Sequence, residues 1–145
     1  MQRKPTTKTT RVTRAAALCM AAMLTAPVSA APPAVKDLAC VAKKGAGDVM
    51  DYSCPLVATG VSQRFRLSAT FEGSHDDTKL AMKPTLDGAV IACDPGSKTS
   101  SLYEDGEVVL KCHFQVTAKA GTKALLAVRL QWYHAQLAKT VFVAE

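Results

Sequence analysis

The chain has 145 residues, a net charge of +6 and 48% hydrophobic residues, which fits one domain behind a short targeting segment. Five Lys and Arg but no acid lie in the first 14 residues, whereas residues 31–145 carry 13 basic and 12 acidic residues, a net charge of +1. This balance argues against a nucleic-acid binder, which needs clustered phosphate contacts, and against a polybasic membrane patch.

Residues 1–30 have the three parts of a secretory signal peptide. The basic start is followed by the uncharged stretch 15–26, and then by Pro27 with small residues at Val28 and Ala30, which predicts cleavage after Ala30. The stretch is too short for a membrane span, which needs about 20 apolar residues. A mitochondrial transit peptide is the alternative, but the compact apolar block favours secretion. Leu18 is too large for a lipoprotein cleavage site at Cys19, which leaves with the signal.

We therefore expect a periplasmic or secreted protein with no stable membrane anchor after cleavage. Residues 31–37, which contain Pro32 and Pro33, are expected to form a flexible N-terminal segment. Residues 38–145 are expected to form a single domain.

Alternating segments follow in chain order and predict half-buried strands. "DLACVA" and "DVMDYSC" flank the turn "KKGAG"; "RFRLSATF" comes next, and "KLAMKPTL" contains Pro84, which places that strand at a sheet edge or a break. "EVVLKCHFQVTA" and "LLAVRLQWYHAQ" complete the set. In the last segment Leu126, Val128, Leu130 and Trp132 form the expected core row.

These strands are separated by glycine-containing turns, and no segment after residue 30 has a convincing helical period. The sequence therefore predicts an all-β fold, a small antiparallel β-sandwich. The order of a charged strand, a hairpin carrying "LDG" and three long alternating strands resembles a small bacterial Ig-like module. "YSC" at 52–54 and "DGEVVLKC" at 105–112 are also similar to parts of the periplasmic lysozyme inhibitors, which are eight-stranded barrels with a disulfide. No residue role carries over from either likeness.

Four cysteines remain after cleavage, and an even count in a small exported domain implies disulfides. The chain has no CxxC or CxxCH spacing for zinc, thiol-redox or haem chemistry. Of the three possible connectivities we favour the sequential one, Cys40–Cys54 and Cys93–Cys112, because each bridge then ties strands that are close in sequence.

The three histidines offer the only candidate metal ligands besides cysteine. His75 lies in the polar turn "GSHDDT", His113 is expected to face solvent, and His134 follows Trp132 on the core parity as a hydrogen-bonded structural histidine. Met50 and Met82 are expected to fill the core rather than to bind copper. We predict no metal site and no cofactor.

The chain lacks a GxSxG elbow, a phosphate loop and an HExxH motif, so we predict a protein that is not an enzyme. One row of the C-terminal long strand, Arg129, Gln131 and Tyr133, lies opposite the core row and is a candidate binding face, because Tyr and Arg are enriched at binding hot spots.

We predict a non-catalytic binding module for an unknown protein or cell-envelope ligand, with no nucleic-acid partner. The alternatives are a periplasmic copper- or zinc-handling protein and an inhibitor of an envelope-degrading enzyme.

Overall fold

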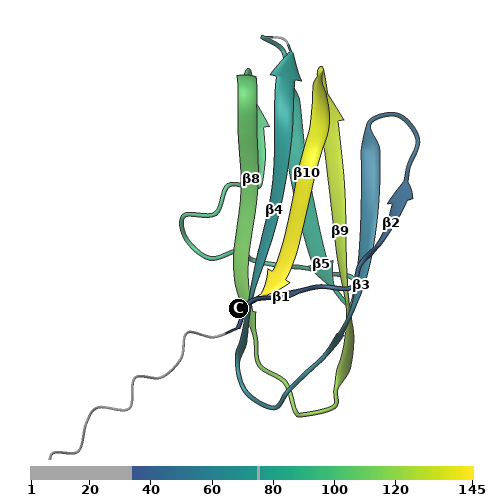
Figure 1. Cartoon of the computed structure of the whole chain (residues 1–145), viewed down its shortest axis with the longest axis vertical. Helices are drawn as coiled ribbons and strands as arrows, with labels where there is room; N and C mark the ends of the chain where they lie inside the picture. The colour runs from purple at the N-terminus through teal and green to yellow at the C-terminus, as the bar shows by residue number, and fades with distance from the viewer. Residues whose placement is uncertain (1–33, 75) are drawn as a thin grey trace, which may run out of the picture. The chain divides into compact units, whose positions relative to one another are not determined.

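The computed structural model describes residues 34–74 and 76–145, and these residues form ten β-strands (Figure 1). The expected signal peptide and His75 lie outside the described residues. The described residues contain no helix long and apolar enough to cross a membrane. The strands are β1 (Lys36–Asp37), β2 (Val41–Lys44), β3 (Val49–Val57), β4 (Gln63–Ser74), β5 (Lys79–Leu86), β6 (Ala89–Val90), β7 (Ser100–Leu102), β8 (Asp105–Val116), β9 (Lys123–Tyr133) and β10 (Ala135–Ala144).

Two antiparallel sheets make up the fold. Sheet A has the order β1-β10-β4-β8, and sheet B has the order β2-β3-β9-β5-β6 with β7 also paired to β5. Figure 1 shows β8, β4 and β10 side by side in one layer, with β9, β5 and β3 in the other. The predicted all-β antiparallel sandwich is confirmed.

The core lies between the sheets and follows the predicted alternation. Leu67, Ala69 and Phe71 of β4 are fully buried, as are Leu126 and Leu130 of β9. Each strand turns its other row outward, as expected for a side-chain period of two. The described core residues are Cys54, Phe65, Leu67, Ala69, Phe71, Leu80, Met82, Val108, Leu110, Cys112, Phe114, Leu126, Val128, Leu130 and Phe142.

Both predicted disulfides are present, Cys40–Cys54 and Cys93–Cys112. Cys54 and Cys112 are 0% exposed, so each bridge has one sulfur inside the core. Cys54 lies on β3, an inner strand of sheet B, and Cys112 lies on β8, the edge strand of sheet A, so each bridge ties a segment outside the long strands to one of them.

Pro84 lies where the outer neighbours of β5 are interrupted. β7 pairs with residues 79–81 and β6 pairs with residues 85 and 86. The Met82 N–H donates to Thr99 O over 2.7 Å, and Pro84 O accepts from Ile91 N–H over 3.1 Å, so both residues point their backbone groups outward. Pro84, which has no N–H to donate, therefore lies between the part of β5 that pairs with β7 and the part that pairs with β6, as the predicted break requires.

The end of the segment expected to be flexible, residues 31–37, is paired with the sandwich. Lys36 and Asp37 form β1 and pair with Ala144 and Val143 of β10. The Leu38 N–H continues this pairing by donating to Phe142 O over 2.9 Å. The edge of β10 that faces away from β4 has backbone groups that need hydrogen-bond partners, and β1 and Leu38 provide them.

His113 is partly covered, rather than solvent-facing as the alternation predicted. The loop after Cys93 runs along the edge of β8: Asp94 N–H donates to His113 O over 2.7 Å, and His113 N–H donates to Ser97 Oγ over 3.1 Å. Its Nε2 atom is buried and has no hydrogen-bond partner among the described residues. A single strand's alternation cannot show that a distant loop will cover its outer row.

Gly73 is required by a close approach of the chain. A Cβ at this position would lie 2.5 Å from Glu104 O. The Glu104 carboxylate is held by the Ser101 hydroxyl at 2.5 Å and by Lys98 Nζ at 3.0 Å, and these contacts hold its pKa below the ordinary value. The loop therefore cannot withdraw without losing its own contacts.

Gly73→Ala is expected to lower the free energy of unfolding by about 1–3 kcal/mol, because overpacking forces the backbone to shift. Urea denaturation measures the change. Ser68→Ala, on the outer row of the same strand, is the control and is expected to stay within about 0.5 kcal/mol of the wild type. Equal stabilities for the two variants would contradict the close approach.

Candidate binding face

The candidate row Arg129, Gln131 and Tyr133 lies on the outer surface of sheet B, opposite the buried Leu126, Val128 and Leu130. We call this surface the sheet B face. Its strands supply the outward residues Val41 and Lys43 of β2; Val49, Asp51, Ser53, Pro55 and Val57 of β3; Lys123, Leu125, Ala127, Arg129, Gln131 and Tyr133 of β9; Lys79, Ala81, Lys83 and Thr85 of β5; Val90 of β6; and Ser100 and Leu102 of β7.

The sheet B face is hollowed rather than flat. One hollow of about 460 Å³ is lined by Ser100, Ala81 and Gln131 together with Tyr133. A second, of about 440 Å³, is lined by Ser53, Thr85, Ala127 and Arg129 among others. Short and long side chains line both hollows together, with Ala81 and Ser100 beside Lys79 and Leu102 in the first and Ser53, Thr85 and Ala127 beside Lys83 and Arg129 in the second. Cross-strand neighbours lie about 5 Å apart, so the two hollows form one surface along β9 and β5.

The residue after Tyr133 fixes how the tyrosine is presented. His134 has a φ of 50°, a left-handed conformation that ends β9 and redirects the chain from sheet B into β10 of sheet A. Its ring stacks on Tyr133 with centroids 3.9 Å apart and an interplanar angle of 25°. His134 Nδ1 contacts Asp77 Oδ1 at 2.5 Å, and the Thr78 hydroxyl donates to His134 O over 3.0 Å.

His134 is thus a hydrogen-bonded structural histidine, but it is exposed rather than on the core side. Its positive φ breaks the alternation on which the expectation of a core position depended. As a result, Tyr133 is 48% exposed, while one face of its ring is held by the stacked imidazole of His134. Lys79 Nζ lies 6.0 Å from the Tyr133 ring centroid, which adds a cation beside the exposed ring.

Arg129 is held by Asp51 through two hydrogen bonds, Nε to Oδ1 at 2.7 Å and Nη2 to Oδ2 at 2.9 Å. The hydrogen bond from Arg129 lowers the pKa of Asp51, and the same bond raises the pKa of Arg129. This bidentate pair fixes the guanidinium in the plane of the carboxylate. Arg129 therefore presents an oriented surface rather than a mobile cation.

The two outer faces of the sandwich differ in their balance of basic and acidic residues. On sheet A, Arg66 lies 2.8 Å from Glu145 and Arg64 lies 3.5 Å from Asp94. On sheet B, Lys79 and Lys83 have no ion-pair partner among the described residues. The outward strand rows of the sheet B face carry five basic residues, Lys43, Lys79, Lys83, Lys123 and Arg129, against the single acid Asp51.

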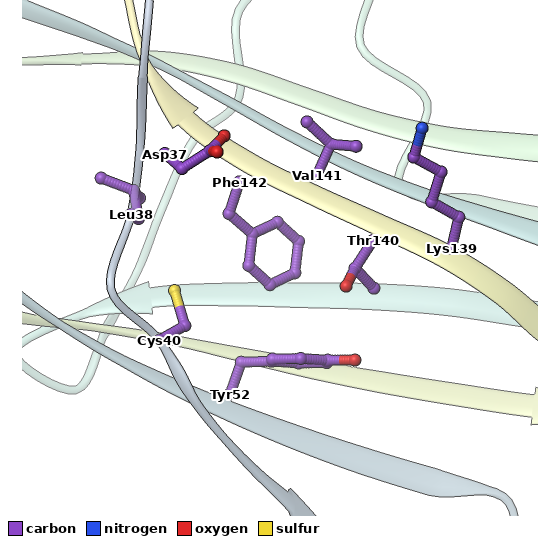
Figure 2. Close-up of a pocket in the computed structure, with 8 residues that line it drawn as sticks. All are labelled: Asp37, Leu38, Cys40, Tyr52, Lys139, Thr140, Val141 and Phe142. Carbon is purple, nitrogen blue, oxygen red and sulfur yellow. The ribbon is translucent and has the colours of Figure 1, made fainter.

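A groove of about 500 Å³ opens elsewhere, between β10 and β3 (Figure 2). Figure 2 shows Thr140 and Phe142 pointing from β10 toward Tyr52, while Lys139 points away. The Tyr52 and Phe142 rings meet edge to face at 5.0 Å. None of the residues of the predicted binding face lines this groove.

The two histidines that the structure describes, His113 and His134, do not come together. His113 pairs with Arg66 on β4, and Ala135, next to His134, pairs with Gly73 of the same strand. At about 3.3 Å per residue, these levels are separated by about 20 Å, too far for one ion. Among the described residues, no group of three or more His, Cys, Asp or Glu is placed to hold a metal ion.

Sequence reasoning missed Lys79, Lys83 and Leu102 as part of the candidate face. The signal for the two lysines was present in "KLAMKPTL", where they alternate with Leu80 and Met82. What the alternation lacked was the pairing of β5 with β9, which places Lys83 opposite Arg129 and Lys79 opposite Tyr133.

No protein-family model matches the chain, and no curated protein matches it significantly. Among solved structures, the chain is similar to the native structure of a family 35 carbohydrate binding module from Clostridium thermocellum. The identity is 8%, the TM-score is 0.36, and the match covers 77% of this chain and 88% of that chain. A likeness at this level carries no argument about the ligand or activity of this chain.

Proposed function

We propose that this protein is an exported, disulfide-stabilised, non-catalytic binding module that recognises a protein or a cell-envelope component through the sheet B face. The observation that carries the proposal is the hollowed face itself, in which small polar side chains lie between Tyr133 and the Arg129–Asp51 pair. Binding sites are typically concave and contain a few oriented polar groups.

The rigidity of the face supports the same proposal. Tyr133 is backed by His134, and Arg129 is fixed by two hydrogen bonds to Asp51. Both residues stand on the central strand β9, which pairs with β3 on one side and β5 on the other. A preorganised surface loses little conformational entropy when it binds.

Two alternatives are less well supported. Metal handling needs ligands that converge, and the separation of His113 from His134 prevents these two from sharing an ion. An inhibitor of an envelope-degrading enzyme is a special case of protein recognition, and it makes no use of the lysines that line the hollows of the sheet B face. The binding-module proposal uses the residues that the fold brings together.

Tyr133→Ala combined with Arg129→Ala is expected to weaken binding by more than tenfold, or about 1.4 kcal/mol, with thermal stability nearly unchanged. Both side chains are exposed, so their loss leaves the core intact. Immobilised protein captures ligands from cell-envelope extract, and the affinity of the purified ligand is then measured by calorimetry.

Thr140→Val is the control, because it removes one hydroxyl from the groove of Figure 2, and Thr140 lines neither hollow of the sheet B face. It is expected to bind normally. Normal binding by the double variant together with weakened binding by Thr140→Val would move the site to that groove and overturn the proposal.

A further inference from the structure

The sheet B face has a charge that the chain as a whole does not. Residues 31–145 are close to neutral, at +1, yet the outward rows of this face have five basic residues and one acid. On sheet A the outward basic residues are matched by as many acids, so the excess positive charge is concentrated on the other side of the sandwich. The basic residues there are Arg64, Arg66, Lys111 and Lys139, and the acids are Glu72 and Glu107 together with Asp94 and Glu145, the partners of the two arginines. Such a concentration selects ligands of opposite charge.

We propose that the ligand of the sheet B face is an anionic polysaccharide, whose carboxylate groups are bound by Lys79 and Lys83 of β5. This inference rests on the proposed function and names its ligand class. The two lysines project from one strand and lie about 13 Å apart, four residues at about 3.3 Å each. A chain with repeated carboxylates, laid along the strands, meets both.

The hollows between the lysines and β9 suit a sugar chain. Ser100, Gln131 and Thr85 offer hydroxyl and amide groups that both donate and accept hydrogen bonds, as sugar hydroxyls require. The Tyr133 ring at one end is exposed and held in place, and offers an apolar surface with a polar tip. The ligand's charge and its hydroxyl groups therefore each have a counterpart on the face.

A protein partner fits this face less well. Lysine is depleted in protein–protein interfaces, whose centres are rich in aromatic residues, Met and Arg. Here Lys79 lines one hollow and Lys83 the other, together with the small residues Ala81, Ser100, Ser53, Thr85 and Ala127. An acidic protein would leave these hollows unfilled.

A lipid surface and a single-stranded nucleic acid also fit less well. A membrane-surface protein buries an apolar face among the acyl chains, whereas the exposed apolar residues of the sheet B face lie on its outer strands or at one end, around a centre that carries Lys83, Arg129 and Asp51. These apolar residues are Val41, Val57, Val90, Leu102 and Leu125. Single-stranded nucleic acid is bound by successive stacking aromatics, and among the outward residues of this face Tyr133 is the one aromatic.

The test uses the exported, oxidised protein and polygalacturonate as the probe, with methyl-esterified polygalacturonate as the neutral probe. Affinity is measured at about 0.01 M and about 0.15 M salt, where the screening lengths are about 30 and 8 Å. The wild type is expected to bind the charged polymer more tightly than the ester, and more tightly at the lower salt.

Lys79→Gln combined with Lys83→Gln is expected to weaken this binding by about tenfold or more. The matched control is Lys111→Gln with Lys139→Gln, which removes the same charge from exposed positions on sheet A and is expected to leave binding unchanged. An equal loss in both variants would show that only net charge matters and would overturn the proposal.

Three further outcomes would overturn the inference: failure to bind polygalacturonate at low salt, equal binding of the ester, or tighter lysine-dependent binding of poly-glutamate, phosphatidylglycerol vesicles or oligo(dT). The proposed function is judged separately, by capture of an envelope component and its loss in the Tyr133 and Arg129 variant. A chain that passes the capture test and fails the polygalacturonate test is a binding module with a different ligand.

Discussion

Replacing Phe71 with alanine is expected to lower the free energy of unfolding by about 3–5 kcal/mol, the range for deleting a buried aromatic ring. Phe71 is 0% exposed and has the largest of the fully buried side chains among the described residues. It extends from β4, at the centre of sheet A, toward Trp132 of sheet B, with ring centroids 5.8 Å apart. Its loss leaves a cavity between the sheets that neither sheet can close alone.

Trp132→Ala provides the comparison, and urea denaturation measures both variants. The sequence placed Trp132 in the core row, but the structure leaves it partly exposed near the end of β9. Because part of its ring already contacts solvent, its removal leaves a less enclosed cavity than removal of Phe71, and it is expected to cost less. A larger loss for Trp132→Ala than for Phe71→Ala would contradict the described packing.

Features that depend on local patterns were predictable from the sequence. Alternation in "RFRLSATF" assigned the rows of β4, because successive side chains of a strand must point to opposite faces. The sequential disulfides followed because each pair of cysteines flanks a turn-rich segment, and Pro84 marked a break because it has no N–H to donate. Each of these conclusions needs only the nearby chain.

Features that depend on which strands become neighbours were not predictable in this way. Nothing in "KLAMKPTL" shows that β5 pairs with β9, so the meeting of Lys79 with Tyr133 was not foreseen. The pairing of Lys36 with Ala144 joins the two ends of the domain. The left-handed His134 redirects the chain between sheets, and no local motif such as Asn-Gly announces it.

The candidate face combines both kinds of feature. Arg129, Gln131 and Tyr133 were predicted to share one face because they alternate with buried residues, and the structure places them together. That Arg129 is paired with Asp51 depends on the register between β9 and β3. The charge excess likewise required the two-dimensional arrangement of the sheet, because the linear sequence is nearly neutral after residue 30.

Removing the Cys93–Cys112 bridge by replacing both cysteines with alanine is expected to lower the free energy of unfolding by about 3 kcal/mol, from the closure entropy of a loop of this size. Alanine is chosen because Cys112 is fully buried, and a serine hydroxyl there would need a hydrogen-bond partner. Urea denaturation of the oxidised proteins measures the loss.

The Cys40–Cys54 bridge is the internal standard for that measurement. The two bridges close segments with sequence separations of 14 and 19 residues, a difference worth only about 0.3 kcal/mol in closure entropy.

The Cys93 bridge has a second role, because it anchors the loop whose Asp94 and Lys98 backbone groups pair with the edge of β8. Its removal is therefore expected to cost more than removal of the Cys40–Cys54 bridge. It should also speed protease cleavage within residues 94–104, since an uncovered edge leaves this loop held by fewer contacts. Equal losses and unchanged cleavage would show that the bridge acts on the unfolded chain alone and that the loop's own hydrogen bonds are enough to cover β8.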